Sequence, residues 1–133
     1  MKLVFFGAPG AGKGTIAKKL YDIYKIPQVS TGDLFREAIK NKTELGDAIA
    51  KIIAEGKLVS DDIAIQVIKE RIAKQDCSNG YILDGFPRTL IQAEKLENLA
   101  PINIAVFFDI KDEEVKTRLC GRRISPKCGR IYH

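Results

Sequence analysis

A glycine-rich segment with one lysine follows the first apolar run of the chain. Residues 7–15 read Gly-Ala-Pro-Gly-Ala-Gly-Lys-Gly-Thr, and Lys13 stands where a helix is expected to begin. Backbone N–H groups in such a turn converge on an anion, the helix N-terminus adds partial positive charge, and Lys13 adds a full charge. The glycines permit positive φ and a close approach of phosphate oxygens. The spacing G-x-x-x-x-G-K therefore predicts a phosphate-binding loop, with a ligand-free turn as the alternative.

The loop departs from the usual pattern at one position. Gly14 follows the lysine, and the hydroxyl that could approach a phosphate-bound metal arrives only at Thr15. Such a loop must be held between a strand and a helix. The rest of the sequence predicts the strands and helices that would do so.

Short apolar runs alternate with amphipathic helical patterns, which predicts an α/β fold with a mostly parallel sheet flanked by helices. The third and fourth predicted strands are nearly continuous in apolar residues, as buried parallel strands are. The predicted strands are 2–6, 27–29, 81–84 and 104–108. The predicted helices follow the loop and then cover about 60–73, 89–99 and 112–120.

The alternation is interrupted at 30–59, where two helical patterns, about 32–41 and 44–55, follow one another. Two helices inserted between sheet strands predict a small subdomain. Ser60 is a plausible N-cap for the long helix that follows. The segment 121–133 is basic and lacks clear periodicity, so it is predicted to open a loop or hairpin.

Composition indicates one ordinary globular domain with a small anionic partner. The 133 residues are 45% apolar and 29% charged, with a formal net charge of +5. The basic residues are dispersed and few aromatic residues lie near them, so a nucleic-acid surface is the weaker interpretation. Three scattered cysteines, no signal peptide and no apolar run of membrane-spanning length predict a cytoplasmic protein without a membrane partner.

Four further segments accompany the phosphate-binding loop. They are Ser-Thr-Gly-Asp-Leu-Phe-Arg at 30–36, Gly-Lys-Leu-Val at 56–59, Asp-Gly-Phe-Pro-Arg at 84–88 with Gln92, and Gly-Arg-Arg at 121–123. In this order and spacing, the five segments resemble the adenylate kinase family along the whole of residues 1–133. The resemblance implies a core at 1–29 and 60–120, a subdomain for the nucleoside monophosphate at 30–59, and the start of a lid at 121–133.

The activity implied by this resemblance is reversible phosphoryl transfer from ATP to AMP, giving two ADP. It is expected to be direct, in line and dependent on Mg²⁺, in a monomer that needs no nucleic acid or membrane. No Cys, His or Ser is placed as a nucleophile beside a base, which speaks against a covalent intermediate. The implied catalytic residues are Lys13, Arg36, Asp84, Arg88 and Arg122.

On the ATP side, the resemblance implies that Lys13 and the loop amides hold the β- and γ-phosphates. Arg118, Arg122 and Arg123 would approach as the lid closes, and Asp84 at a strand end could hold a Mg²⁺-bound water. The implied ATP-binding residues are Gly10, Ala11, Gly12, Lys13, Gly14, Thr15, Arg118, Arg122, Ile131 and Tyr132.

On the AMP side, the resemblance implies that Arg36 and Arg88 grip the phosphate, since guanidinium forks match phosphate oxygens. Gln92 both donates and accepts, as an adenine edge requires, so that Thr31 with Gln92 favours AMP. The implied AMP-binding residues are Thr31, Arg36, Lys57, Leu58, Val59, Gly85, Phe86, Pro87, Arg88 and Gln92.

Each residue also has an ordinary structural interpretation. Arg36 and Arg88 could be surface bases, Asp84 could cap the next turn, and Arg118 and Gln92 could face solvent from helices. For the chain as a whole, the alternatives are a kinase for another nucleoside monophosphate, a nucleotide-binding fragment with little turnover, and a basic nucleic-acid binder.

Two departures from the family pattern carry expectations. Family members are longer, so the rest of the lid, its later arginines and a fifth sheet strand are expected to be missing from these 133 residues, and the chain alone is expected to turn over slowly. The zinc-bearing lid has Cys-x-x-Cys where this chain has Ser125 and Cys128. Because zinc takes four ligands, we expect no protein-bound metal there, with Cys128 as the candidate ligand.

Overall fold

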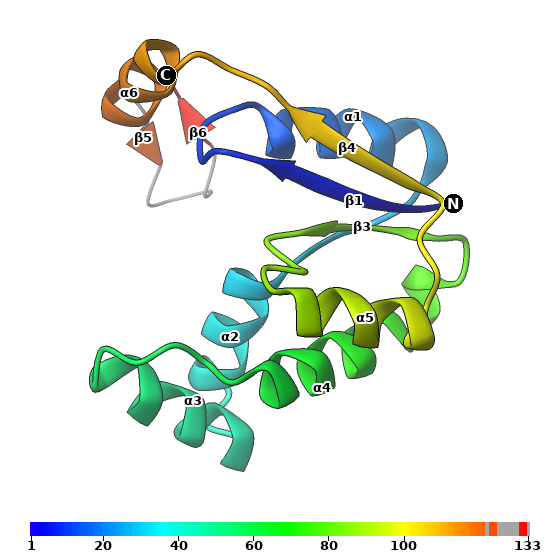
Figure 1. The fold of residues 1–133 in the computed structure, drawn as a ribbon, viewed down its shortest axis with the longest axis vertical. Coiled ribbons are helices and arrows are strands. Elements are labelled where there is room, and N and C mark those ends of the chain that lie inside the picture. Colours follow the sequence, from blue (N-terminus) through cyan, green and yellow to red (C-terminus); the bar gives the residue numbers. More distant parts are fainter. Residues whose placement is uncertain (122, 125–130, 133) are drawn as a thin grey trace.

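A computed structural model describes residues 1–121, 123–124 and 131–132 of the chain. Four parallel strands form one sheet in the order β2-β3-β1-β4 (Figure 1). They are β1 (Lys2–Gly7), β2 (Gln28–Ser30), β3 (Tyr81–Asp84) and β4 (Ile104–Phe108). A separate antiparallel pair joins β5 (Arg123–Ile124) to β6 (Ile131–Tyr132), which agrees with a hairpin, one of the two alternatives predicted for this segment. The parallel α/β fold is confirmed.

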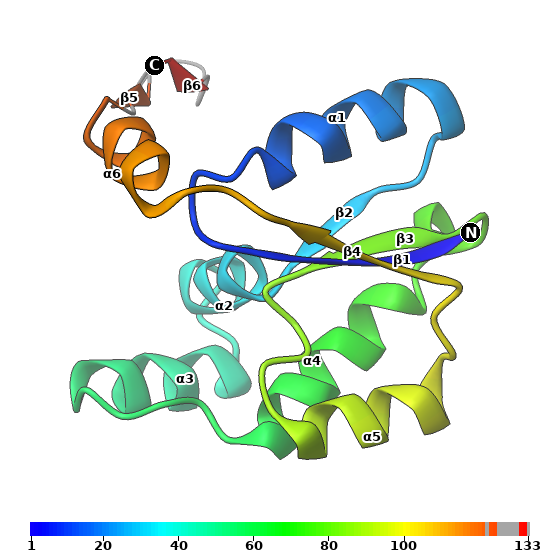
Figure 2. The ribbon, with the colours of Figure 1, turned by 45° about the horizontal axis from the view of Figure 1, so that its top comes forward.

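Helices cover both faces of the sheet (Figures 1 and 2). On one face lies α1 (Lys13–Tyr24), and on the other lie α4 (Asp61–Ile72) and α5 (Leu90–Leu99). The remaining helices are α2 (Thr31–Lys40), α3 (Glu44–Ala54), the short 3-10 turn η1 (Gln75–Cys77) and α6 (Asp112–Gly121). The strands and α-helices predicted from sequence are all present and differ at their ends by about one residue, whereas η1 was not predicted.

The inner strands bury both of their faces. Alternate residues of β1 point to opposite sides, so Leu3 and Phe5 pack with Ala17 of α1, while Val4 packs with the helices of the other face. In β3, the neighbouring Ile82 and Leu83 belong to opposite clusters, and both are fully buried. The prediction of a buried strand at 81–84 is thereby confirmed, and this rigid strand ends at the candidate site.

The same prediction is wrong for β4. Its Ile104 is 48% exposed and its Phe107 is 71% exposed. The strand pairs with β1 on one side, and it contributes only the partly buried Val106 and Phe108 to the core beneath α1. An apolar run specifies a strand, but its burial depends on what covers the sheet edge.

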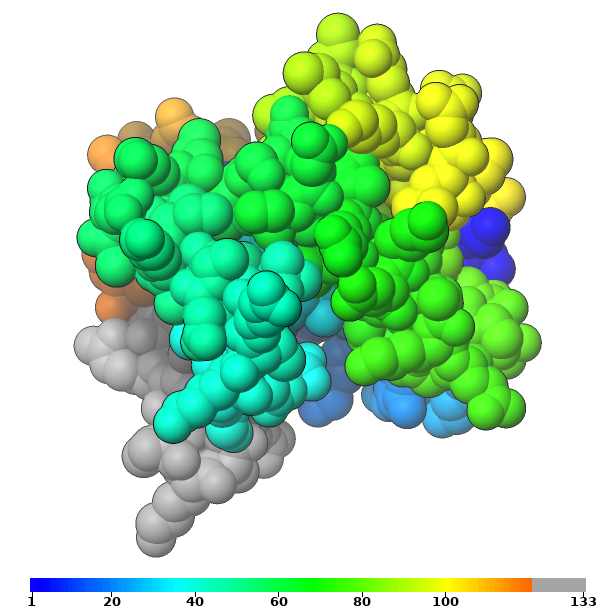
Figure 3. All heavy atoms as spheres, turned by 90° about the horizontal axis from the view of Figure 1, so that it is seen from below, coloured from blue at the N-terminus to red at the C-terminus, as the bar shows by residue number. Residues whose placement is uncertain are grey.

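α2 and α3 pack against each other outside the two helical layers of the sheet. Figure 3 views the face on which these helices (cyan to green) lie beside α4 and α5 (green to yellow). The helices approach closely at Gly46, where an added Cβ would lie 2.0 Å from the Ala38 carbonyl oxygen of α2. Thr43 caps α3 by accepting a 2.9 Å hydrogen bond from the Gly46 N–H, and Ile49 is fully buried.

We expect Gly46→Ala to destabilise the chain by about 1–3 kcal/mol, because the backbone of α2 must move to admit the methyl group. The matched control is Gly32→Ala in α2, whose Cβ would first meet the flexible end of Arg36 at 3.3 Å. That variant should unfold at the same denaturant concentration or a higher one, since alanine favours a helix. Equal unfolding midpoints for the two variants in urea would contradict the close packing at Gly46.

A polar clasp closes the turn between α4 and β3. Arg71 donates 2.8 Å hydrogen bonds to both carboxylate oxygens of Asp76 and lies 3.1 Å from the Cys77 sulfur. The Arg71 hydrogen bond lowers the pKa of Asp76, so the stability from this pair is present at neutral pH and is lost only as the pH falls through that lowered pKa. Burial raises the pKa of the Cys77 thiol, which keeps it protonated and unreactive.

Candidate functional site

The glycine-rich loop connects the end of β1 to the start of α1. It opens with a turn closed by a 3.1 Å hydrogen bond from the Ala11 N–H to the Ala8 carbonyl oxygen. Gly10 and Gly12 have φ of +81° and +99°, values that side-chain-bearing residues rarely adopt. Because the first N–H groups of α1 have no carbonyl one turn earlier to bond, they are available to an anion at this loop.

The positive φ that glycine permits is not used at Gly14. Gly14 lies in the first turn of α1 and is not among the glycines with positive φ. Apart from its chain neighbours and the backbone of its own helix, no atom of the described residues lies within 4 Å of a Cβ built on Gly14. Its lack of a side chain therefore leaves open space beside the loop, which suits a bulky anion.

Lys13 folds back over the loop that precedes it. Its Nζ donates to the carbonyl oxygens of Gly7 at 2.6 Å and Ala8 at 3.3 Å, and lies 3.8 Å from Asp84 Oδ1. Its side chain is 15% exposed. The ammonium group is thus held inside the bend of the chain, where an anion would meet it together with the loop amides.

Asp84 ends β3, between the ends of β1 and β2. The strand register places it opposite Phe5 on one side and Ser30 on the other. Besides the Lys13 ammonium, its carboxylate contacts Gln28, whose Nε2 donates to Oδ2 at 2.9 Å. Asp84 is therefore more than a cap of the next turn. Its carboxylate is held by Gln28 and Lys13 at the carboxyl end of the sheet.

The next residue, Gly85, gathers a second group of side chains. Its carbonyl oxygen accepts hydrogen bonds from Arg88 Nε at 2.7 Å and from the buried Thr31 hydroxyl at 3.2 Å. An added Cβ at Gly85 would lie 3.1 Å from Arg88 Nη2 and 3.2 Å from Thr31 Oγ1. Arg36 forms an exposed ion pair with Asp33 at the start of α2.

Gln92 is 6% exposed, so it is not the helix-surface glutamine of the alternative interpretation. Its Oε1 accepts a 2.7 Å hydrogen bond from the Arg88 N–H, and its Nε2 donates to Asp61 Oδ1 at 2.8 Å. Thr89 caps α5 by accepting from the Gln92 N–H at 3.1 Å. The amide is therefore built into the turn that carries Arg88.

Arg118 in α6 is brought to the glycine-rich loop from far along the sequence. Its Nη1 donates to the Gly10 carbonyl oxygen at 3.3 Å and lies 3.8 Å from a Cβ built on Gly12. The guanidinium group thus contacts the loop, so Arg118 is not an arginine that faces only solvent.

The link between α3 and α4 stands apart from the Gly85 group in this structure. Lys57 forms a 3.1 Å ion pair with Glu55, Leu58 is 93% exposed and Val59 is half-buried. In both ribbon views the link runs from α3 to α4 below the sheet (Figures 1 and 2). Phe86, by contrast, is buried in the core next to the site.

Several candidates lie outside the described residues. These are Arg122, Cys128 and the side chains of Ile131 and Tyr132. Within the described ranges, no group of three or more His, Cys, Asp or Glu side chains is arranged to hold a metal ion. None of the helices in these ranges has the length and apolar character needed to cross a bilayer.

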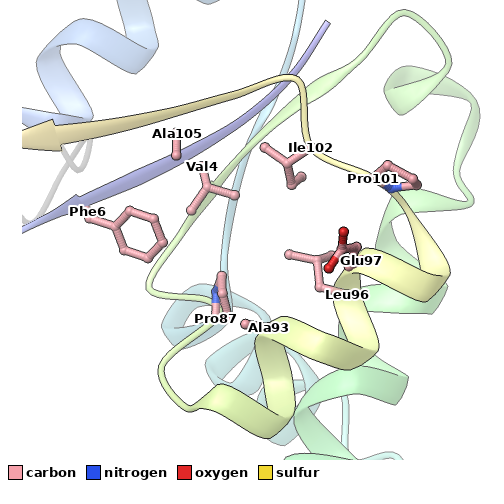
Figure 4. Close-up of a pocket in the computed structure, with 9 residues that line it drawn as sticks. All are labelled: Val4, Phe6, Pro87, Ala93, Leu96, Glu97, Pro101, Ile102 and Ala105. Carbon is pink, nitrogen blue, oxygen red and sulfur yellow. The ribbon is translucent and has the colours of Figure 1, made fainter.

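An apolar cavity of about 270 Å³ lies between the sheet and α5, with Pro87 at its rim (Figure 4). It is lined by Val4, Phe6, Pro87, Ala93, Leu96, Glu97, Pro101, Ile102 and Ala105. The lining contains one acidic side chain and no basic one, so it does not suit a phosphate. The glycine-rich loop, Lys13 and the Gly85 group lie instead at the carboxyl ends of the strands, where ligands bind in open parallel sheets.

The side chains that hold the site residues in place were not predicted from the sequence. Gln28 and Asp61 belong to no recognised motif. Each contacts a residue far away in the sequence, Gln28 with Asp84 and Asp61 with Gln92. A signal for Gln92 was available, because Thr89-Leu-Ile-Gln92 matches the pattern of a helix N-terminal capping box. In the structure, the Gln92 side chain bonds the N–H of Arg88 rather than that of Thr89.

Comparison with known proteins agrees with this geometry. The family model described as adenylate kinase matches residues 5–128. Proteins named adenylate kinase from Treponema denticola and Thermosipho africanus are 51% and 46% identical over 133 and 138 residues. One from Francisella philomiragia is 49% identical over 134 residues.

Each alignment covers the whole of this chain, which spans 64%, 64% and 62% of the length of these three relatives. The matched region contains the glycine-rich loop, the end of β3 and the Gly85 group. The chain belongs to the adenylate kinase family.

Proposed function

We propose that this chain binds ATP and AMP and transfers the γ-phosphoryl group directly between them, giving two ADP. The observation that carries the proposal is the meeting of two phosphate-binding groups on consecutive residues. The loop lysine approaches Asp84, and Arg88 and Thr31 bond Gly85. The triphosphate of ATP and the phosphate of AMP, bound at adjoining residues, can be aligned for in-line transfer, which is the main task of a phosphoryl-transfer site.

On the donor side, the amides of residues 10–15 and Lys13 would hold the β- and γ-phosphates of ATP. Arg118 already contacts the loop, so it is placed to add charge there. Arg122, Ile131 and Tyr132 are assigned to ATP by the family resemblance alone. As the γ-phosphorus bonds to an AMP phosphate oxygen, its bond to the β–γ bridging oxygen breaks, and the cationic groups stabilise the charge on ADP.

On the acceptor side, Arg88 and Arg36 would bind the phosphate of AMP, with Arg36 leaving its ion pair with Asp33. Thr31, Gln92 and the backbone of 57–59 would receive the adenine. Because Lys57 and Leu58 are exposed in this structure, we propose that 30–59 moves as a unit toward the core and excludes water. Exclusion matters because water would otherwise accept the phosphoryl group.

The residues at the end of β3 fit a bound Mg²⁺. Asp84 presents carboxylate oxygens, which Mg²⁺ prefers, and Gln28 and Lys13 restrain it without covering both oxygens with close contacts. We propose that Asp84 holds the ion through its water shell. When bound with ATP, Mg²⁺ would neutralise charge on the β- and γ-phosphates.

The proposal predicts that AMP binds this chain more tightly than CMP, UMP or GMP, and that ATP with AMP yields ADP. Calorimetric titration measures the binding, and a coupled assay measures ADP formation. A preference for CMP or UMP would assign the chain to a related nucleoside-monophosphate kinase. Binding of both nucleotides without ADP formation would indicate a nucleotide-binding chain without turnover, and salt-dependent DNA binding unaffected by ATP would contradict the proposal.

A further inference from the structure

Asp61, the first residue of α4, joins the end of the α3–α4 link to the turn that carries Gln92. Its Oδ1 accepts hydrogen bonds from Gln92 Nε2 at 2.8 Å and from Thr89 Oγ1 at 3.2 Å. Thr89 Oγ1 in turn accepts from the Gln92 N–H at 3.1 Å. One carboxylate oxygen therefore holds both the cap of α5 and the side-chain amide three residues into it.

These contacts give the Gln92 amide a single orientation. A backbone N–H can only donate, so the group facing Arg88 N must be the oxygen of the amide. A carboxylate can only accept, so the group facing Asp61 must be the nitrogen. One N–H and one oxygen lone pair then remain free on Gln92. Asp61 and Arg88 determine which side of the amide carries this donor and which side carries this acceptor.

That order matters for a purine base. Adenine offers a donor at its exocyclic amino group where guanine offers an acceptor at its carbonyl oxygen, and the neighbouring ring nitrogens differ in the opposite sense. An amide held one way matches adenine, and the same amide turned by 180° matches guanine. A glutamine that turns freely would therefore discriminate poorly between the two bases.

We propose that Asp61 is a positioning residue that selects adenine over guanine by fixing the orientation of the Gln92 amide. The proposal rests on the proposed function, in which Gln92 contacts the base of the monophosphate. Asp61 directly follows the α3–α4 link. It therefore also connects the Gln92 amide to the end of segment 30–59, which is proposed to move over AMP.

A general role for Asp61 as a negative charge at a helix N-terminus does not explain this arrangement. Asp62 occupies the same first turn of α4 and also bridges to α5, through an ion pair with Lys95. Its side chain is 84% exposed. Asp62→Ala is therefore a matched control that removes an equivalent charge and an equivalent link between the helices while leaving the two partners of the Gln92 amide in place.

The test compares Asp61→Ala, Asp61→Asn and Asp62→Ala with the unsubstituted chain, by titration with AMP and GMP. Loss of a hydrogen bond to a charged partner should weaken AMP binding about tenfold or more in Asp61→Ala. GMP binding should weaken less, so the ratio of the two affinities falls. The asparagine side chain in Asp61→Asn can still accept a hydrogen bond from Gln92, so the affinity ratio of this variant should lie between those of Asp61→Ala and the unsubstituted chain. Asp62→Ala should keep the ratio of the unsubstituted chain.

A double variant separates positioning from stability. In Asp61→Asn with Gln92→Glu, the new carboxylate accepts from Arg88 N and from the amide of the new asparagine, so the internal hydrogen bonds persist. Its free edge then carries acceptors only. We expect a thermal midpoint near that of the unsubstituted chain together with the loss of AMP preference.

The orientation itself is observable without any nucleotide, from the side-chain amide signals of Gln92 in a ¹⁵N NMR spectrum. In Asp61→Ala, these protons should exchange faster with water, whereas Asp62→Ala should leave them unchanged. If Asp61→Ala leaves both the signals and the affinity ratio unchanged, the role of Asp61 is overturned. If Asp61→Ala releases the amide but the unsubstituted chain binds no AMP, the proposed function is overturned instead.

Discussion

Arg88→Lys is expected to lower the rate of ADP formation from ATP and AMP by about 10³-fold or more, the scale on which a positioned arginine acts in phosphoryl transfer. The guanidinium group uses its Nε–H on the Gly85 carbonyl oxygen. Its four Nη hydrogens are left for a planar, bidentate grip on phosphate. A lysine ammonium group has its three donors on a single nitrogen, so it cannot present the planar pair of parallel N–H groups that binds two phosphate oxygens while another N–H bonds Gly85.

Because geometry rather than charge is expected to decide this loss, Arg88→Met should lower the rate little further than Arg88→Lys. The control is Lys95→Met on the exposed side of α5, which removes a positive charge and an ion pair with Asp62 away from the Gly85 group. A reduction of less than tenfold in Arg88→Lys, with the control unaffected and both variants folded by circular dichroism, would show that Arg88 is peripheral to the transfer.

The features that sequence analysis predicted well are those whose causes are local. The loop at 7–15 needs only its own glycines and lysine, with a strand before it and a helix after it. Gly10 and Gly12 have the positive φ that these residues permit. The Ser60 cap of α4 likewise follows from neighbouring residues, since its Oγ accepts from the Ile63 N–H at 3.3 Å.

The features that could not be predicted depend on residues far apart in the sequence. Gln28 and Asp84 are separated by 56 residues and meet because β2 and β3 pair in parallel. Asp61 and Gln92 are separated by 31 residues and meet because α4 and α5 lie side by side. A single sequence shows which groups can bond, but the pairing of partners is decided by sheet register and helix packing.

The exposure of β4 has the same origin. The run 104–108 has the apolar composition of a buried strand, and it does form one. Its burial is a property of the sheet edge and of whatever packs there, which no local pattern records. The resemblance to the family implied roles for Arg36, Arg88 and Gln92, and the structure adds which carbonyl, carboxylate or amide each of them contacts.

Lys13→Met is the second substitution with a large expected effect, on binding of ATP as well as on transfer. The ammonium group lies 2.6 Å from the Gly7 carbonyl oxygen and 3.8 Å from Asp84, so it is held inside the loop where the phosphates are proposed to bind. Removing one such preorganised charge should lower the transfer rate by about 10²-fold or more. Methionine keeps most of the apolar stem, so the substitution chiefly removes the charge.

The affinity for ATP, measured by calorimetry, should fall in Lys13→Met while the affinity for AMP stays the same, because the acceptor groups gather on Gly85 rather than on the loop. Lys19→Met, at an exposed position of the same helix, is the matched control and should bind ATP as the unsubstituted chain does. Loss of AMP binding together with ATP binding would mean that Lys13 supports the whole strand end through Asp84. If Lys13→Met binds ATP as tightly as Lys19→Met, the donor phosphates lie elsewhere and the assignment of the glycine-rich loop is wrong.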